Sequence, residues 1–240
     1  MLFSNEQQRV ALVGENCKKS LFVISNPRRF NMRSATMRSN PLFMRNEYET
    51  TGKFGIPIVK KQEINFENAA LIACSETKTN DSSANKKKGV HFFVDDYRFS
   101  GIYDHPKRSL ARYFQYAFLL TPDFSTYGDM DLWRQIESVG KNRWCGAFWQ
   151  SHGLLVVPTI SWSGSASYEF CFDGVEKEAV VAIGMVGCKK SRLEFMRGYN
   201  AMLERLQPAT ILCLGEPFTE MEGNIIPIEY RGRFAGKEAC

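Results

Sequence analysis

Short apolar runs alternate with amphipathic segments along the second half of the chain. Five of these runs are apolar on consecutive positions and rich in β-branched or aromatic side chains: residues 89–96, 117–123, 153–162, 178–187 and 209–217. Consecutive apolar positions are typical of strands that are buried on both faces of a parallel sheet. Two earlier segments, residues 54–60 and 68–75, have the same character. The pattern therefore predicts about seven strands.

The clearest helix is expected between the last two of these runs, over residues 191–208. Ser191 and Glu194 have the S-x-x-E spacing of a capping box. One stripe of the helix carries the apolar residues Leu193, Met196, Tyr199, Leu203 and Leu206. Such a stripe indicates a helix that packs on a core along one side.

Two further helices are expected upstream. Residues 129–153 are helical in their first half, and Gly140 and Gly146 predict a break in the second half. Residues 105–116 place Pro106 in a first-turn position ahead of an apolar face.

Alternating strands and helices predict an α/β fold in which mainly parallel strands are joined by right-handed crossovers. An open twisted sheet and a partial or irregular (β/α) barrel both fit this order, and we favour the barrel-like arrangement. We expect an α/β core domain over residues 46–240 and a basic, irregular N-terminal extension over residues 1–45. The carboxyl ends of the strands then open on one side, where parallel α/β proteins bind ligands.

Charge is distributed unevenly along the chain. The formal net charge is +5, but residues 1–89 hold 15 Lys and Arg against 8 Asp and Glu, whereas residues 90–240 hold 16 against 18. A basic segment joined to a slightly acidic core predicts a partner with phosphate groups, such as a nucleic acid or a nucleotide. A solvated face without a partner has the same charge pattern.

The sequence predicts a cytoplasmic protein without a membrane partner. No apolar stretch is long enough to span a membrane, and the first residues lack the apolar core of a signal peptide. The seven cysteines include no C-x-x-C pair, which favours reduced thiols over a disulfide framework or a zinc ribbon.

Acidic residues follow three of the predicted strands, with Asp95 and Asp96 after the first, Asp123 after the second and Glu216 after the last. Carboxylate oxygens are the ligands that Mg²⁺ or Mn²⁺ prefers, so Asp95, Asp123 and Glu216 are candidate cation ligands. Asp96 and His105 are candidates for proton transfer, and all five residues are candidate catalytic groups. Each acid taken alone fits a helix cap or an ion pair as well.

The adjacent aspartates predict two separate roles. Neighbouring side chains of a strand point to opposite faces. We expect Asp95 to face the shared edge and Asp96 to turn away toward Arg98.

Several polar and aromatic residues close to these acids are candidate substrate ligands: Arg98, Ser125, Arg143, Trp149, Gln150 and Trp162. A tryptophan face can stack on a base or a sugar. Tryptophans that only fill the core beneath the sheet edge would give the same sequence.

A series of motifs resembles a known family of bacterial, phage and mobile-element proteins, the domain of unknown function numbered four-four-one-seven. The motifs are HFFVDDYRF, TPDFSTYGDM, RWCGAFWQSHGLLVVPTISW, SYEFCFDGVEKEAVVAIGMVG, GYNAML and LGEPF. The resemblance covers residues 40–230. It implies an intracellular protein linked to phages or plasmids and often encoded near replication or defence genes, and it carries over no catalytic or binding residues.

Three classes of function fit these features. The first is a metal-assisted enzyme that acts on a phosphodiester or a nucleotide. The second is a non-enzymatic module that binds nucleic acid or a host protein, including a counter-defence role, in which the acids are structural. The third is a glycoside-type hydrolase that uses two of the carboxylates. We favour the first class.

Overall fold

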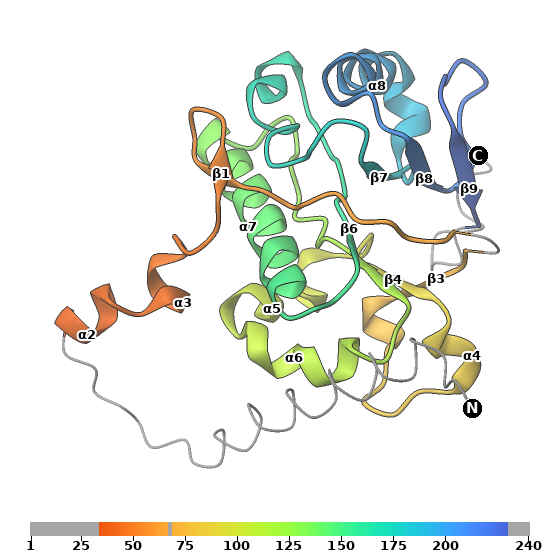
Figure 1. Cartoon of the computed structure of the whole chain (residues 1–240). Coiled ribbons are helices and arrows are strands. Elements are labelled where there is room, and N and C mark those ends of the chain that lie inside the picture. The colour runs from red at the N-terminus through yellow and green to blue at the C-terminus, as the bar shows by residue number, and fades with distance from the viewer. Residues whose placement is uncertain (1–33, 67–68, 230–240) are drawn as a thin grey trace. The chain divides into compact units, whose positions relative to one another are not determined.

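The computed structural model describes residues 34–66 and 69–229, and the chain divides into one unit that ends at Glu47 and another that begins at Tyr48 (Figure 1). Residues 1–33 of the expected basic extension lie outside the described residues. The first unit holds the short helices α2 (Ser34–Arg38) and α3 (Pro41–Met44). The side chain of Asn40 caps α3 by accepting a 3.0 Å hydrogen bond from the Leu42 N–H.

Seven strands run parallel in the part of the second unit that the structure describes. Four of them pair in the order β3 (Leu71–Ala73), β4 (Gly89–His91), β5 (Phe118–Leu120) and β6 (Val156–Val157). The other three pair in the order β7 (Val180–Gly184), β8 (Thr210–Leu214) and β9 (Ile225–Ile228). A parallel bridge between Thr159 and Ala182 joins the two sheets. The strands therefore follow one another in sequence order.

This arrangement confirms the expected α/β class with parallel strands. The two sheets share one apolar cluster, formed by Phe118, Leu120, Val157, Ala182, Leu212, Leu214 and Ile228. Gly184 on β7 lets the ring of Phe93, which follows β4, come within 2.8 Å of the place where a Cβ would lie. In the described residues no pairing joins β9 to β3. The strands thus face a common interior without closing into a barrel.

The structure corrects one strand prediction and adds one strand that was not predicted. Residues 54–60 do not join the parallel strands, because β2 (Ile56–Pro57) pairs antiparallel with β1 (Thr50–Thr51) and packs on α7 (Leu132–Ser151). The seventh parallel strand is β9, which the apolar pattern does not reveal. It lies at the edge of its sheet, is mostly half-buried or exposed and contains Pro227, a residue that sheets tolerate at an edge.

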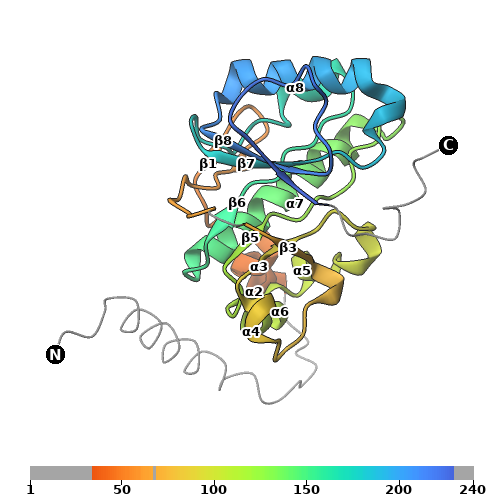
Figure 2. The same ribbon diagram turned by 90° about the vertical axis from the view of Figure 1, so that its right-hand side faces the viewer.

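Helices connect and cover these strands. The remaining helical segments are η2 (Cys74–Glu76), α4 (Ser83–Lys86), η3 (Asp96–Arg98), α5 (Gly101–Asp104), α6 (Pro106–Tyr113), η4 (Ser165–Glu169), η5 (Cys188–Ser191) and α8 (Arg192–Leu206). α7 packs against β6, and α5 and α6 lie against α7 (Figure 1). α8 covers one face of β7 and β8 (Figure 2). In the described ranges no helix is long and apolar enough to cross a membrane.

α7 is continuous, so the predicted break at its glycines is wrong. A Cβ at position 146 would lie 2.6 Å from the Thr121 side chain and 2.7 Å from that of Val59, whereas one at position 140 would meet only Ile56 at 3.9 Å. Gly146 therefore serves close packing between the helix and the strands beneath it.

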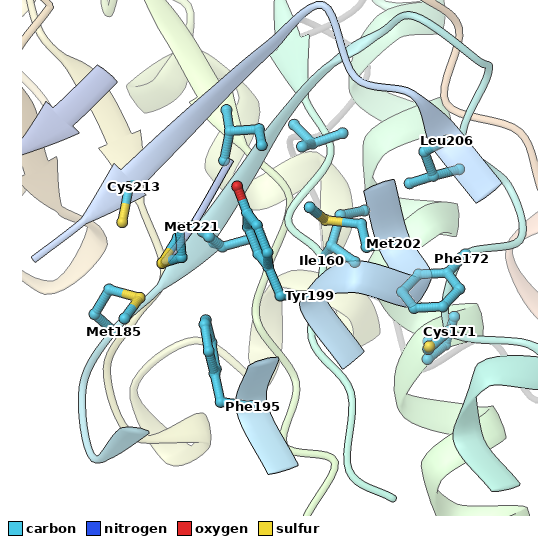
Figure 3. Packing of buried hydrophobic residues seen from close by; sticks show 14 of the residues in the cluster. Ile160, Cys171, Phe172, Met185, Phe195, Tyr199, Met202, Leu206, Cys213 and Met221 are labelled. Atoms are coloured by element: carbon cyan, nitrogen blue, oxygen red, sulfur yellow. The ribbon is translucent and has the colours of Figure 1, made fainter. Parts of the chain in front are cut away.

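The predicted apolar stripe of α8 faces the core except at Leu193. Tyr199 and Leu206 lie in the core cluster together with Phe195 and Met202, which the stripe leaves out (Figure 3). Met196 and Leu203 of the stripe pack against this cluster, while Leu193 is 65% exposed. Spacings of four, three and four residues place Phe195, Tyr199, Met202 and Leu206 on one helical face.

The expected capping box at the start of α8 does not form. Ser191 stands at the N-cap position, but its side chain makes no capping hydrogen bond. Glu194 instead accepts a 2.6 Å hydrogen bond from Arg197 at the helix surface. The preceding η5 turn gives Ser191 φ −123° and ψ 34°, outside the extended backbone that a capping serine usually adopts.

Candidate functional site

The exits of β4 and β5 are linked by the carboxylate of Asp96. β4 ends at His91, and the chain then turns through η3, which begins at Asp96. Ser125, beyond β5, donates to Asp96 twice, from its N–H at 3.1 Å and from its hydroxyl at 2.8 Å. The two hydrogen bonds fix the Asp96 carboxylate between neighbouring strand exits.

The two adjacent aspartates take the opposite orientations to those predicted. Asp96 faces the exit of β5, whereas Asp95 is exposed and lies 3.8 Å from Arg98. The prediction assumed that strand alternation continues to the aspartates. It ends at His91, so the tight turn of η3 sets the direction of each side chain.

Asp123, at the exit of β5, is the most perturbed carboxyl group at this edge. Its Oδ1 atom is buried and has no hydrogen-bond partner in the described residues. Burial, with a smaller contribution from the neighbouring Asp96, raises the pKa of Asp123 to about 7, against the opposing hydrogen bond from Ser161 and the positive charge of Arg143. Near neutral pH this carboxyl group can therefore both release and accept a proton.

The environments of Asp96 and Asp123 differ although the two side chains interact. Asp96 accepts two hydrogen bonds from Ser125. Asp123 is desolvated and retains its proton more readily. Carboxyl groups in unlike surroundings can take different roles in proton transfer.

The predicted cation site does not assemble from Asp95, Asp123 and Glu216. In residues 34–66 and 69–229 no three His, Cys, Asp or Glu side chains form a group that could hold a metal ion. Glu216 is exposed at the exit of β8, three strands from β5 in the observed order. At about 4.8 Å for each strand step, the separation along the sheet is roughly 14 Å.

Arg143 and Gln150 have structural contacts in place of the expected contacts with a substrate. Arg143 is 1% exposed, and its guanidinium donates to the carbonyls of Asp173, Thr159 and Cys171 at 2.8–3.0 Å. Gln150 binds the backbone of residue 60 from both ends of its amide, at 2.7 and 2.8 Å. Both side chains hold the chain around α7 in place.

Trp149 and Trp162 pack in or against the core, which is one of the two interpretations that the sequence leaves open. Trp149 is fully buried and stacks on Phe92 with 5.5 Å between ring centroids. Trp162 packs on α8, where a Cβ at Gly198 would lie 2.2 Å from its indole ring. The residue type was visible in the sequence, but its position in the core depends on contacts between distant segments.

The sequence did not reveal two arginines as candidate binding residues. Arg108 and Arg112 on α6 line a cavity together with Arg98 and His105, the latter an exposed residue immediately before α6. Their i, i+4 spacing is the signal that could have revealed them, because it places both on one helical face.

Comparisons with known proteins place these features in a phage context. The model of a family described as "Domain of unknown function (DUF4417)" matches residues 48–231. The Gene 1 protein of Mycobacterium phage L5 is 35% identical over 178 residues, which is 73% of this chain and 77% of that protein. The Gene 1 protein of Mycobacterium phage D29 is 34% identical over 177 residues, 72% of this chain and 65% of that protein. No solved structure matches the chain.

Proposed function

We propose, on the premise that the chain belongs to this DUF4417 family with its phage relatives, that it acts on a phosphodiester or a nucleotide at the carboxyl edge of its parallel strands. The observation that carries the proposal is the environment of the Asp123 carboxyl group. A carboxyl group with one buried, unpaired oxygen and a pKa of about 7 is costly to keep in a fold, and such groups cluster at functional sites.

In this proposal Asp123 is the proton-transfer group of a hydrolysis. Its ionised form takes a proton from a water molecule while the water oxygen forms a bond to phosphorus. The bond from phosphorus to the leaving oxygen breaks, and that oxygen takes a proton from solvent or from the protonated Asp123. Asp96, held by Ser125, is the neighbouring acid that helps to raise the pKa of Asp123.

Mg²⁺ or Mn²⁺ enters the proposal as an ion bound jointly with the substrate. Magnesium is commonly held by one or two carboxylates together with phosphate oxygens and water. Asp96 would supply such a carboxylate, and Asp123 would remain the proton-transfer group.

The proposal is tested by incubating the full chain with single-stranded DNA, duplex DNA, RNA and nucleoside triphosphates, with Mg²⁺, with Mn²⁺ and with EDTA. The Asp123→Asn variant should lose at least about a hundredfold in turnover, the usual range for removal of a general acid or base. Asp129→Asn is the matched control, because Asp129 is an exposed aspartate on the same β5–α7 connection. Equal turnover by wild type and Asp123→Asn on every substrate would refute the proposal.

The arginines beside α6 favour a second candidate, binding of nucleic acid without chemistry. In that case oligonucleotides bind the chain, none of the substrates is consumed, and Asp123→Asn binds as well as the wild type. The two candidates are separated by measuring binding and turnover on the same preparations.

A further inference from the structure

A cavity of 380 Å³ beside α6 is lined by basic, small and apolar residues and by no acidic residue. Its charged lining comes from Arg98 at the end of η3 and from Arg108 and Arg112 on α6, with His105 at the turn between α5 and α6. Thr79, Gly101 and Ser109 also line it. The volume lies near the lower end of the range of about 300–1,000 Å³ for small-molecule sites.

The three guanidinium groups have few partners within the described residues. Arg108 is exposed, and its side chain makes no hydrogen bond or ion pair there. Arg112 is partly buried; its Nε has no hydrogen-bond partner, and its one hydrogen bond goes to the Tyr113 hydroxyl at 3.3 Å. Arg98 meets a single carboxylate, that of Asp95, at 3.8 Å.

The Cys74 thiol and the Tyr113 hydroxyl, which interact with Arg112, do not neutralise this positive charge. Burial raises the pKa of the Cys74 thiol to about 12, although Arg112 and Arg98 both act to lower it. Burial also raises the pKa of the Tyr113 hydroxyl. Both groups stay uncharged at neutral pH, and the cavity retains an excess of positive charge.

We propose that Arg98, Arg108 and Arg112 form a binding site for a phosphate group. Arginine presents a planar fork of N–H donors that matches phosphate oxygens, and it is the residue of choice for phosphate recognition. Thr79 adds a hydroxyl group to the lining. The phosphate belongs either to the backbone of a nucleic acid or to a free nucleotide, and this choice of source rests on the proposed function.

The phosphate site adjoins the carboxyl edge through one short turn. Asp96 and Arg98 are the first and last residues of η3, and Asp96 contacts Ser125 while Arg98 lines the cavity. A phosphate held by the arginines would therefore anchor a substrate next to Asp96 and Asp123. Such an anchor orients the reacting group, which is a large part of catalysis of phosphoryl transfer.

The test is calorimetric titration of the full chain with four probes: inorganic phosphate, a nucleoside 5′-monophosphate, the matching nucleoside, and a single-stranded oligonucleotide without a terminal phosphate. We expect the monophosphate to bind and the nucleoside to bind at least tenfold more weakly. Binding of the oligonucleotide with higher affinity than the monophosphate identifies the backbone as the source, and the reverse order identifies the free nucleotide.

The residues are tested by Arg108→Gln and Arg112→Gln, with Arg197→Gln on the surface of α8 as the matched control. Each cavity variant should weaken binding of the tighter probe by about tenfold to hundredfold, the loss typical of a hydrogen bond to a charged group. It should also reduce the salt dependence of oligonucleotide binding by about 0.7 log units per log unit of salt. Because Arg108 is exposed, Arg108→Gln should fold and still tests the site even if Arg112→Gln unfolds.

Wild-type affinity of both cavity variants for every probe would overturn the proposal, as would equal affinity for nucleoside and monophosphate. The Asp123→Asn variant separates this result from the proposed function. Phosphate binding that survives Asp123→Asn while turnover is lost supports both proposals. Turnover that depends on Asp123 but is unaffected by Arg108→Gln and Arg112→Gln overturns the phosphate site and leaves the proposed function standing.

Discussion

Replacing Asp123 by asparagine should change how the stability of the protein depends on pH. The folded state raises the pKa of this carboxyl group from 3.8 to about 7 because the group is buried. Below pH 3.8 both states hold the proton. As the pH rises toward 7 the unfolded chain releases its proton while the folded protein keeps it, so stability falls across this interval. Asparagine has no such proton, and the variant should lose this decline.

The size of the effect follows from the two pKa values. At ~1.4 kcal/mol for each pKa unit, the difference between 3.8 and about 7 corresponds to about 4 kcal/mol. Asp123 is partly exposed, and solvent screening reduces the expected change to about 2 kcal/mol. Asp123→Asn should therefore be more stable than the wild type by about 2 kcal/mol at pH 8 and nearly equal to it at pH 4.

The assay is urea unfolding followed by far-ultraviolet circular dichroism at pH 4, 6 and 8, for the wild type, Asp123→Asn and the control Asp129→Asn. Other titrating groups contribute equally to all three proteins and cancel in the differences. The control should follow the wild type at every pH. Parallel pH profiles for wild type and Asp123→Asn would show that Asp123 ionises normally in the folded protein, and the reasoning would fail.

Three further changes test the surroundings of the site. Gly146→Ala should destabilise the protein by about 1–3 kcal/mol in urea unfolding, because its Cβ would overlap two side chains. Gly140→Ala on the same helix should stabilise the protein by up to about 1 kcal/mol. A loss of stability in both variants would contradict the close packing of α7 at Gly146. Arg143→Ala should lower the free energy of unfolding by about 4 kcal/mol, since three carbonyls lose their donor. The control Arg197→Ala should lower it by less than about 0.5 kcal/mol. Equally small losses in the two variants would count against the structural role of Arg143. Burial lowers the pKa of His91 to about 4, so the unfolded chain binds a proton below pH 6.5 that the folded protein excludes. The contribution of His91 to stability should therefore fall by about 3 kcal/mol from pH 6.5 to 4, opposite in sign to the effect of Asp123, and this fall is measured as the difference in unfolding free energy between the wild type and His91→Gln; a difference that does not change with pH would refute the assignment.

The sequence predicts the strands and their shared edge because those depend on local patterns. Consecutive apolar residues mark β3 to β8, and parallel pairing follows from the alternation with helices. An edge strand such as β9 needs fewer apolar residues and tolerates proline, so the same rule overlooks it.

Side-chain direction is harder to predict because it depends on one or two residues of register. The strand before Asp95 and Asp96 ends at His91, three residues before the last apolar residue of the run, and this exchanges their orientations. The predicted stripe of α8 likewise includes Leu193, which is exposed, and leaves out Phe195 and Met202, which are buried.

The roles of single polar and aromatic residues depend on contacts between segments far apart in the chain. Arg143 is a buried structural residue because three carbonyls from other segments surround it, and Trp149 is buried because Phe92 stacks on it. The cavity beside α6 likewise requires η3 and α6 to lie together. None of these proximities has a signature in the local sequence.

The proton-transfer role of Asp123 is tested most directly by titrating its carboxyl group. The titration is followed by carbon-13 nuclear magnetic resonance of the labelled protein, and the signal is assigned with Asp123→Asn. We expect a midpoint near pH 7, and a lower midpoint in Asp96→Asn because the neighbouring negative charge is removed. A midpoint near 3.8 in the folded wild type would contradict the claim that this edge of the sheet holds a proton-transfer group.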